Sequence, residues 1–148
     1  MKIRSVEAVA PSLRKLPKGD RWEYDSDWLA AIVLKGEGVI KITIKRGYWT
    51  DLASVPKALR GAFDNGSGSY GVLMASQVHD MLYSTHYMSK DFADNIFLAL
   101  LRYYGMGCVK ANLYYYAVKL FGDEAWEAAE ADLEADCALC RFEWLARL

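Results

Sequence analysis

The chain has 148 residues, of which 53% are hydrophobic and 14% aromatic, enough to build one domain with a sizeable, well-packed core. Its formal net charge of −1 at pH 7 supplies no bulk attraction to nucleic acid, so no nucleic-acid partner is expected. The N-terminus carries Lys2 and Arg4 without an adjoining apolar segment, so no secretory signal is expected. The longest apolar stretches, such as 29–34 and 96–101, are far too short to form a transmembrane segment.

The N-terminal third of the chain predicts β-structure, and the remainder predicts helices. Strand candidates lie at 21–24, 29–34 and 39–44, and Lys35-Gly36-Glu37-Gly38 has the composition of a hairpin turn. Helices are expected at 70–83, 90–104, 108–121 and 123–146. Strands followed by helices indicate an α+β fold, with N-terminal antiparallel β-strands and a C-terminal bundle of about four helices. We expect a single domain, β-rich over about 1–56 and helical over about 70–148.

The segment 47–56 follows the last of these strands and ends in a turn, because Pro56 biases Val55 away from helix. Asp51 and Ser54 can each hydrogen-bond nearby backbone amides, which is the ordinary use of these residues in turns. The alternative is a loop that brings an acid and a hydroxyl to the mouth of a site formed by the helices. The spacing alone does not choose between these interpretations.

The segment Val78-His79-Asp80-Met81-Leu82-Tyr83 is the most informative in the chain, which contains only two histidines. At about 100° per residue, His79 falls inside the apolar stripe of the helix at 70–83. Asp80 falls at the edge of that stripe, and Tyr83 lies one turn further on the same side. An acid–imidazole pair is not needed there for helix stability, so these residues are candidates for a functional site.

The next helix, at 90–104, carries Asp94 at the margin of its apolar face. The connector at 84–88 is short enough for an antiparallel helix pair. If the two apolar faces pack together, Asp94 approaches His79. We therefore predict that the two side chains lie within hydrogen-bond reach, directly or through one water, with the acid or hydroxyl of segment 47–56 nearby.

One interpretation of this arrangement is catalytic. A partly buried imidazole with a carboxylate on one nitrogen has a fixed tautomer and can act as a general base through the other nitrogen. His79 and Asp94 are then the catalytic candidates, with Tyr83 and Ser54 as supporting residues.

A carboxylate at the pocket edge can also hold Ca²⁺, which prefers oxygen ligands, and Asp80 and Asp51 are the candidate metal ligands. The competing interpretation is structural. In it, His79 is a core histidine bonded to a backbone carbonyl, while Asp80 and Asp94 cap helices or pair with Lys or Arg. A His-Asp dipeptide by itself favours the structural interpretation, because short motifs often occur by chance. The acid at the margin of the next apolar face brings the two interpretations nearer to even.

Several motifs occur in order along the chain: Thr50-Asp51-Leu52-Ala53-Ser54-Val55-Pro56, His79-Asp80-Met81-Leu82-Tyr83, Ala93-Asp94-Asn95-Ile96-Phe97, Tyr116-Ala117-Val118-Lys119 and Gly122-Asp123-Glu124-Ala125-Trp126. Together, over about 41–126, they resemble an uncharacterised family of small proteins encoded by bacteriophages and prophages. The resemblance implies a location in the host bacterial cytoplasm or the virion. It also implies phage structural proteins or a host factor as partners, but no particular reaction.

His-Asp-x-x-Tyr at 79–83, followed by a helix bearing an acid, also resembles the catalytic helix pair of phospholipases A2. In that family the histidine activates a water, the next acid binds Ca²⁺ and the later acid orients the histidine. The resemblance implies these roles for His79, Asp80 and Asp94. The Gly-rich segment 66–71 does not match the calcium loop of that family, and the flanking disulfides of its secreted members are absent.

The expected last helix carries an apolar stripe at three- and four-residue steps: Trp126, Ala129, Leu133, Cys137, Cys140, Trp144 and Leu148. Its acids predict a solvated face opposite a stripe that packs on the core, with an added docking element as the alternative. The run Tyr114-Tyr115-Tyr116 is expected mainly in core packing, with a ligand groove or subunit contact as the alternative.

Two functions follow from these patterns. The first is a phage- or prophage-encoded small hydrolase, phospholipase A2-like, with His79 as general base and Asp80 and Asp94 as metal-binding or orienting acids. The second is a non-enzymatic phage protein, a tail or capsid component or an accessory protein, in which these residues form a structural polar network. Solvent access to His79 distinguishes them, because a catalytic histidine needs an open cleft and a structural one is sealed.

Overall fold

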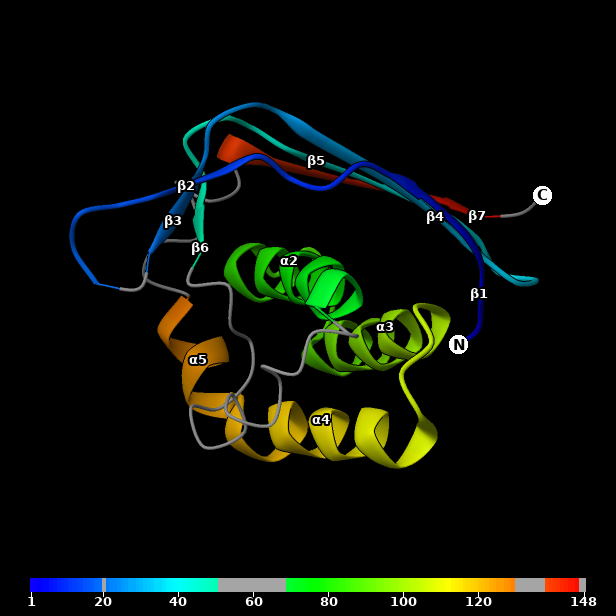
Figure 1. Cartoon of the computed structure of the whole chain (residues 1–148). Coiled ribbons are helices and arrows are strands. Elements are labelled where there is room, and N and C mark those ends of the chain that lie inside the picture. Colours follow the sequence, from blue (N-terminus) through cyan, green and yellow to red (C-terminus); the bar gives the residue numbers. More distant parts are fainter. Residues whose placement is uncertain (20, 51–68, 130–137, 147–148) are drawn as a thin grey trace.

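The computed structural model describes residues 1–19, 21–50, 69–129 and 138–146. A four-stranded sheet forms one layer, a pair of helices lies beneath it, and a further long helix lies on the side of that pair away from the sheet (Figure 1). Antiparallel strands followed by helices make the fold α+β, as predicted. None of the described helices combines the length and the apolar character needed to cross a bilayer.

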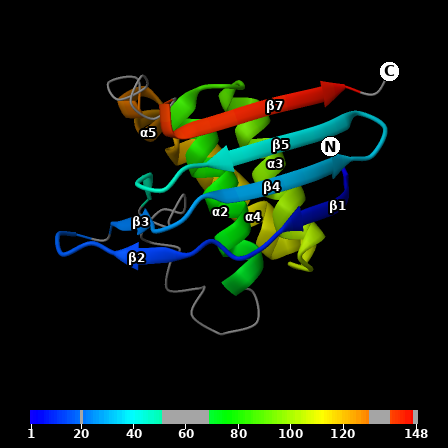
Figure 2. The same ribbon diagram turned by 90° about the horizontal axis from the view of Figure 1, so that it is seen from above.

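The larger sheet has four antiparallel strands in the order β1 (Ile3–Ala8), β4 (Trp28–Leu34), β5 (Gly38–Ile44) and β7 (Cys140–Ala146). Its strands pass across the helices beneath them (Figure 2). In β4 and β5 every second residue is buried, which gives the sheet one apolar face. That face carries Trp28, Ala30, Ile32, Leu34, Ile40, Ile42 and Ile44.

A smaller antiparallel sheet has the order β2 (Leu13–Lys15), β3 (Trp22–Tyr24) and β6 (Trp49–Thr50). The strands predicted at 21–24, 29–34 and 39–44 are confirmed as β3, β4 and β5. The predicted hairpin turn joins β4 to β5. Gly38 is required there, because a Cβ at this position would lie 2.3 Å from the carbonyl oxygen of Leu145 on β7.

The helices are α2 (Ser69–Thr85), α3 (Lys90–Tyr103), α4 (Cys108–Phe121) and α5 (Asp123–Ala128). Ser89 caps α3 by accepting a hydrogen bond from the Phe92 amide at 3.2 Å. Gly71, near the start of α2, lies against Tyr104, just beyond the end of α3. The predicted antiparallel pairing of these helices follows, and their buried side chains form one core with the inner face of the larger sheet.

The prediction of a helix over 123–146 is wrong for its last part. Helix α5 ends at Ala128, and Cys140–Ala146 forms β7 in antiparallel register with β5. Residues 130–137 lie outside the described residues. Without β7, strand β5 would present a row of unpaired backbone groups at the sheet edge, and pairing satisfies them. Trp144, which the helical stripe placed on the core, is 37% exposed.

Candidate active site

His79 on α2 and Asp94 on α3 meet inside the helix pair. The Nε2 atom of His79 lies 2.9 Å from Oδ1 of Asp94, and each side chain is 1% exposed. This distance confirms the predicted hydrogen-bond reach between the two residues. The loop residues expected beside them, Asp51 and Ser54, lie outside the described residues.

Asp94 accepts hydrogen bonds from three side chains. Besides His79, the Tyr83 hydroxyl donates to Oδ1 at 2.7 Å, and Lys90 Nζ donates to Oδ2 at 3.0 Å. Burial by itself raises the pKa of Asp94, but the hydrogen bonds from His79, Tyr83 and Lys90 outweigh burial and hold that pKa below its usual value. Asp94 is therefore an ionised carboxylate, which accepts hydrogen bonds and donates none.

The Asp94 carboxylate fixes the tautomer of His79. Because the carboxylate only accepts, Nε2 must carry the proton of this hydrogen bond. Burial lowers the pKa of His79, and the opposing effect of Asp94 does not restore it, so the imidazole is neutral and Nδ1 carries a lone pair. Nδ1 is buried and has no hydrogen-bond partner among the described residues. An oriented nitrogen with a lone pair is what a general base requires.

Aromatic rings hold the imidazole in this orientation. The ring centroid of His79 lies 4.0 Å from that of Tyr83 and 5.0 Å from that of Phe97. Burial, followed by the contact with Asp94, raises the pKa of Tyr83, so its phenol stays protonated and remains a donor. Tyr83 follows His79 by four residues, which places both on one face of α2. Tyr83, which was predicted as a supporting residue, hydrogen-bonds Asp94 directly.

Lys90 connects this site to the last helices. Its Nζ also lies 3.2 Å from the carbonyl oxygen of Lys119 and 3.3 Å from Oδ1 of Asp123. The ammonium group therefore lies between two carboxylates, and its charge stabilises ionised Asp94. Lys90 was not among the predicted site residues. Its only sequence signal is the four-residue spacing to Asp94, which is common for exposed helical ion pairs.

Asp80 belongs to a different set of contacts from His79. Its Oδ2 accepts a hydrogen bond from Thr50 Oγ1 at 2.8 Å, and further along α2 the hydroxyls of Tyr48 and Ser84 are 2.7 Å apart. These contacts attach one face of α2 to β6 and the segment before it. The edge position predicted for Asp80 is confirmed, since it is less buried than His79 and contacts the smaller sheet.

Calcium binding by Asp80 and Asp51 stays a prediction. Among the described residues, no group of three or more His, Cys, Asp and Glu side chains could hold a metal ion. Asp94 is a poor candidate ligand, because its two oxygens already accept from three donors. Asp51, the second candidate ligand, lies outside the described residues.

Two other polar groups on α2 were not predicted as site residues. Ser76 Oγ and Gln77 Nε2 are buried and, like His79 Nδ1, have no hydrogen-bond partner among the described residues. Gln77 accepts a hydrogen bond from the Tyr24 hydroxyl through its oxygen, so it faces the smaller sheet. Ser76 precedes His79 by three residues and therefore lies on the same side of α2 as the imidazole.

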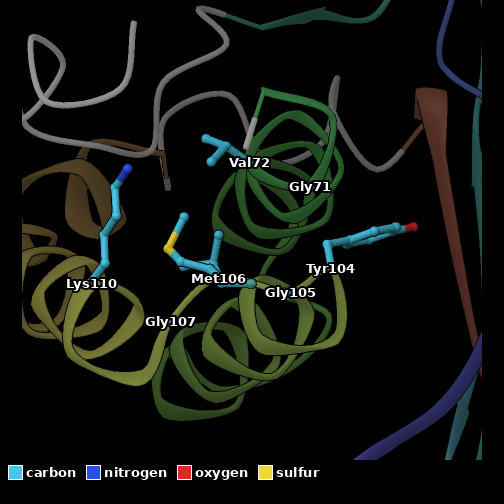
Figure 3. A pocket seen from close by; sticks show the side chains of 8 residues that line it. Gly71, Val72, Tyr104, Gly105, Met106, Gly107 and Lys110 are labelled. Atoms are coloured by element: carbon cyan, nitrogen blue, oxygen red, sulfur yellow. The ribbon is translucent and has the colours of Figure 1, made fainter. Parts of the chain in front are cut away.

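A pocket of about 170 Å³ lies at the opposite end of α2 from the start of α3 (Figure 3). Its lining includes Gly71, Val72, Met106 and Lys110. His79 is seven residues beyond Val72, a rise of about 10 Å along a helix, and is not part of this lining. The pocket therefore provides no direct opening to the imidazole.

Comparison with known proteins identifies a family without a known reaction. The family model described as "Protein of unknown function (DUF1353)" matches residues 28–118. This range begins with β4, ends within α4, and includes His79, Asp80, Tyr83, Lys90 and Asp94. No curated protein and no solved structure matches the chain.

Proposed function

We propose that this chain, which belongs to the DUF1353 family of proteins of unknown function, is a small hydrolase in which His79 is the general base. The observation that carries the proposal is the state of the two imidazole nitrogens: Nε2 donates to Asp94, and Nδ1 is a buried lone pair without a partner among the described residues. A buried histidine kept for packing alone normally has both nitrogens hydrogen-bonded. The pairing of an oriented tautomer with an unused nitrogen supports a catalytic role.

The proposed reaction is hydrolysis of an ester, in keeping with the resemblance to phospholipases A2. Nδ1 of His79 removes a proton from a water molecule while the water oxygen bonds to the ester carbonyl carbon. The imidazole then carries a proton on each nitrogen, and the Asp94 carboxylate stabilises its positive charge. When the tetrahedral intermediate collapses, the C–O bond to the leaving alcohol breaks and the alcohol takes the proton from Nδ1. The products are a carboxylic acid and an alcohol, and His79 returns to its neutral form.

Tyr83 and Lys90 act in this proposal through Asp94. By donating to both carboxylate oxygens, they hold Asp94 ionised and fix its position against Nε2. They therefore position the acid that orients the base and do not touch the reacting atoms.

The burial of His79 favours the second candidate function, a non-enzymatic phage or prophage protein in which the network is structural. His79 is 1% exposed, so a substrate reaches Nδ1 only if part of the surrounding fold moves. The contacts of Asp94 and Lys90 join α2, α3, α4 and α5, and such a buried polar network rigidifies a fold. In a virion component or accessory protein, the network would serve only to rigidify the fold.

A paired substitution of the two histidines tests the hydrolase. His79→Asn keeps a side chain of similar shape but removes the base, and the rate of ester hydrolysis should fall at least about 10²-fold. The substrates are a soluble aryl ester and phospholipid vesicles. His86→Asn is the matched control, because His86 stacks on Trp126, 3.8 Å between ring centroids, and its Nε2 hydrogen-bonds the Trp126 carbonyl oxygen at 3.0 Å instead of a carboxylate. Its rate should stay close to that of the wild type.

The opposite results would support the structural alternative. If the wild type hydrolyses neither substrate, or if His79→Asn retains the full rate, the hydrolase proposal fails. A lowered melting temperature in His79→Asn without any wild-type turnover would identify the network as structural. Mass spectrometry of purified phage particles would then determine whether the protein is a virion component.

A further inference from the structure

Two buried polar atoms on α2 share one side of the helix. Ser76 is 0% exposed and His79 1% exposed, and neither Ser76 Oγ nor His79 Nδ1 has a hydrogen-bond partner among the described residues. Residues three apart on a helix are neighbours, with about 5–6 Å between their Cβ atoms. Leaving a buried hydroxyl and a buried imidazole nitrogen without partners is unfavourable.

We propose that one water molecule binds between Ser76 Oγ and His79 Nδ1, and that Ser76 positions this water for attack. Buried waters usually make two to four hydrogen bonds to polar groups that lack other partners. In the tautomer fixed by Asp94, Nδ1 can only accept, so the water must donate a proton to it. The Ser76 hydroxyl both donates and accepts, so it can bind the same water and fix the direction of the oxygen lone pair. The role in attack rests on the proposed hydrolase function, whereas the water site does not.

Ser76→Ala tests the inference, with Ser84→Ala as the matched control on the same helix. Ser84 hydrogen-bonds Tyr48 and belongs to the face of α2 that contacts the smaller sheet. A high-resolution crystal structure of the wild type should show a water bonded to both Ser76 Oγ and His79 Nδ1. In Ser76→Ala that water should be lost or displaced, and the ¹⁵N chemical shift of Nδ1 should change. In Ser84→Ala neither should change.

Kinetics then separate the water site from the hydrolase. Ser76→Ala should lower kcat about 10-fold, the effect of one lost hydrogen bond, and leave KM unchanged, while Ser84→Ala keeps the wild-type kcat. Hydrolysis that depends on His79 but is equal in Ser76→Ala and the wild type, with no bridging water, overturns the inference and leaves the hydrolase standing. If the wild type shows the bridging water but no hydrolytic activity, the water site is supported and the proposed hydrolase function is wrong.

Discussion

His79 and Asp94 form a buried hydrogen bond of 2.9 Å between two side chains that are each 1% exposed. The carboxylate is ionised and the imidazole neutral, so one charge is enclosed in the core with three donors around it. An enclosed charge is stable only while its donors remain in place, and removal of one partner leaves the others unsatisfied. The stability of the fold should therefore depend strongly on Asp94.

Asp94→Ala should lower the free energy of unfolding by about 3–5 kcal/mol, the cost of breaking a buried charge pair from one side. The substitution leaves the His79 Nε2–H, the Tyr83 hydroxyl and the Lys90 ammonium without their common acceptor. Urea unfolding followed by circular dichroism measures the change. Asp91→Ala is the control, an exposed acid in the first turn of the same helix, and it should cost less than about 1 kcal/mol. Equal decreases in the free energy of unfolding of the two variants would contradict the inference that Asp94 carries a buried charge on which the fold depends.

The same site predicts how stability depends on pH. The folded pKa of His79 is lowered, so below about 6.5, where an unfolded histidine takes up a proton, the unfolded state binds more protons than the folded state. The free energy of unfolding should therefore fall as the pH drops below that value, by up to ~1.4 kcal/mol per pH unit. The pKa of Asp94 is also lowered. The stability that ionised Asp94 contributes is fully present above about pH 3.9, the pKa of an unfolded aspartate, and is lost as the pH falls through the folded pKa.

Urea unfolding at pH 7.5, 6 and 5, values chosen to span about 6.5, checks this prediction. His79→Asn should remove most of the decrease in this range, while His86→Asn should retain it. A decrease that is the same in wild type and His79→Asn would show that another group is responsible.

Periodicity was sufficient to predict the contact between His79 and Asp94, because both residues lie at defined angles on helices joined by a short connector. It was not sufficient for Lys90, since a Lys four residues before an Asp is usually an exposed pair and here it is 17% exposed. Periodicity also placed Asp80 only at a helix edge. Its contact with Thr50 depends on β6, a two-residue strand too short to recognise from its sequence. The candidate site was thus predictable where local geometry determines it, and not where distant elements complete it.

Lys90→Met should affect both stability and the titration of His79. The variant loses the charged hydrogen bond to Asp94, so the free energy of unfolding should fall by about 1.5–3 kcal/mol. Lys90 also contributes to the lowered pKa of His79, so that pKa should rise in the variant, which NMR titration of the imidazole signals measures. Lys41→Met, at an exposed position of β5, should change stability by no more than about 0.5 kcal/mol. An unchanged His79 titration in Lys90→Met would exclude an electrostatic role for this lysine.

The pairing of β7 with β5 makes the sharpest prediction about the fold, because the helical periodicity of the C-terminal segment predicts a different structure. Thr43 on β5 lies directly opposite Arg141 on β7. Directly opposed residues of antiparallel strands have Cα atoms about 4.5–5.5 Å apart, a separation that a disulfide can bridge. Thr43→Cys with Arg141→Cys should therefore form a disulfide on mild oxidation, once Cys108, Cys137 and Cys140 have been replaced. Peptide mapping by mass spectrometry identifies the bond.

A shifted pair provides the control for this cross-link. Lys41 lies opposite Glu143, so Lys41→Cys with Arg141→Cys places the thiols on a diagonal, with about 7–8 Å between the two positions. This pair should oxidise far more slowly, because a disulfide seldom spans Cα atoms more than about 7 Å apart. If 140–146 were instead a helix, neither pair would be held in register and the two rates would be similar. Rapid oxidation of the opposed pair alone would establish that 140–146 is a strand and would establish its register with β5. The helical periodicity of this segment predicts neither.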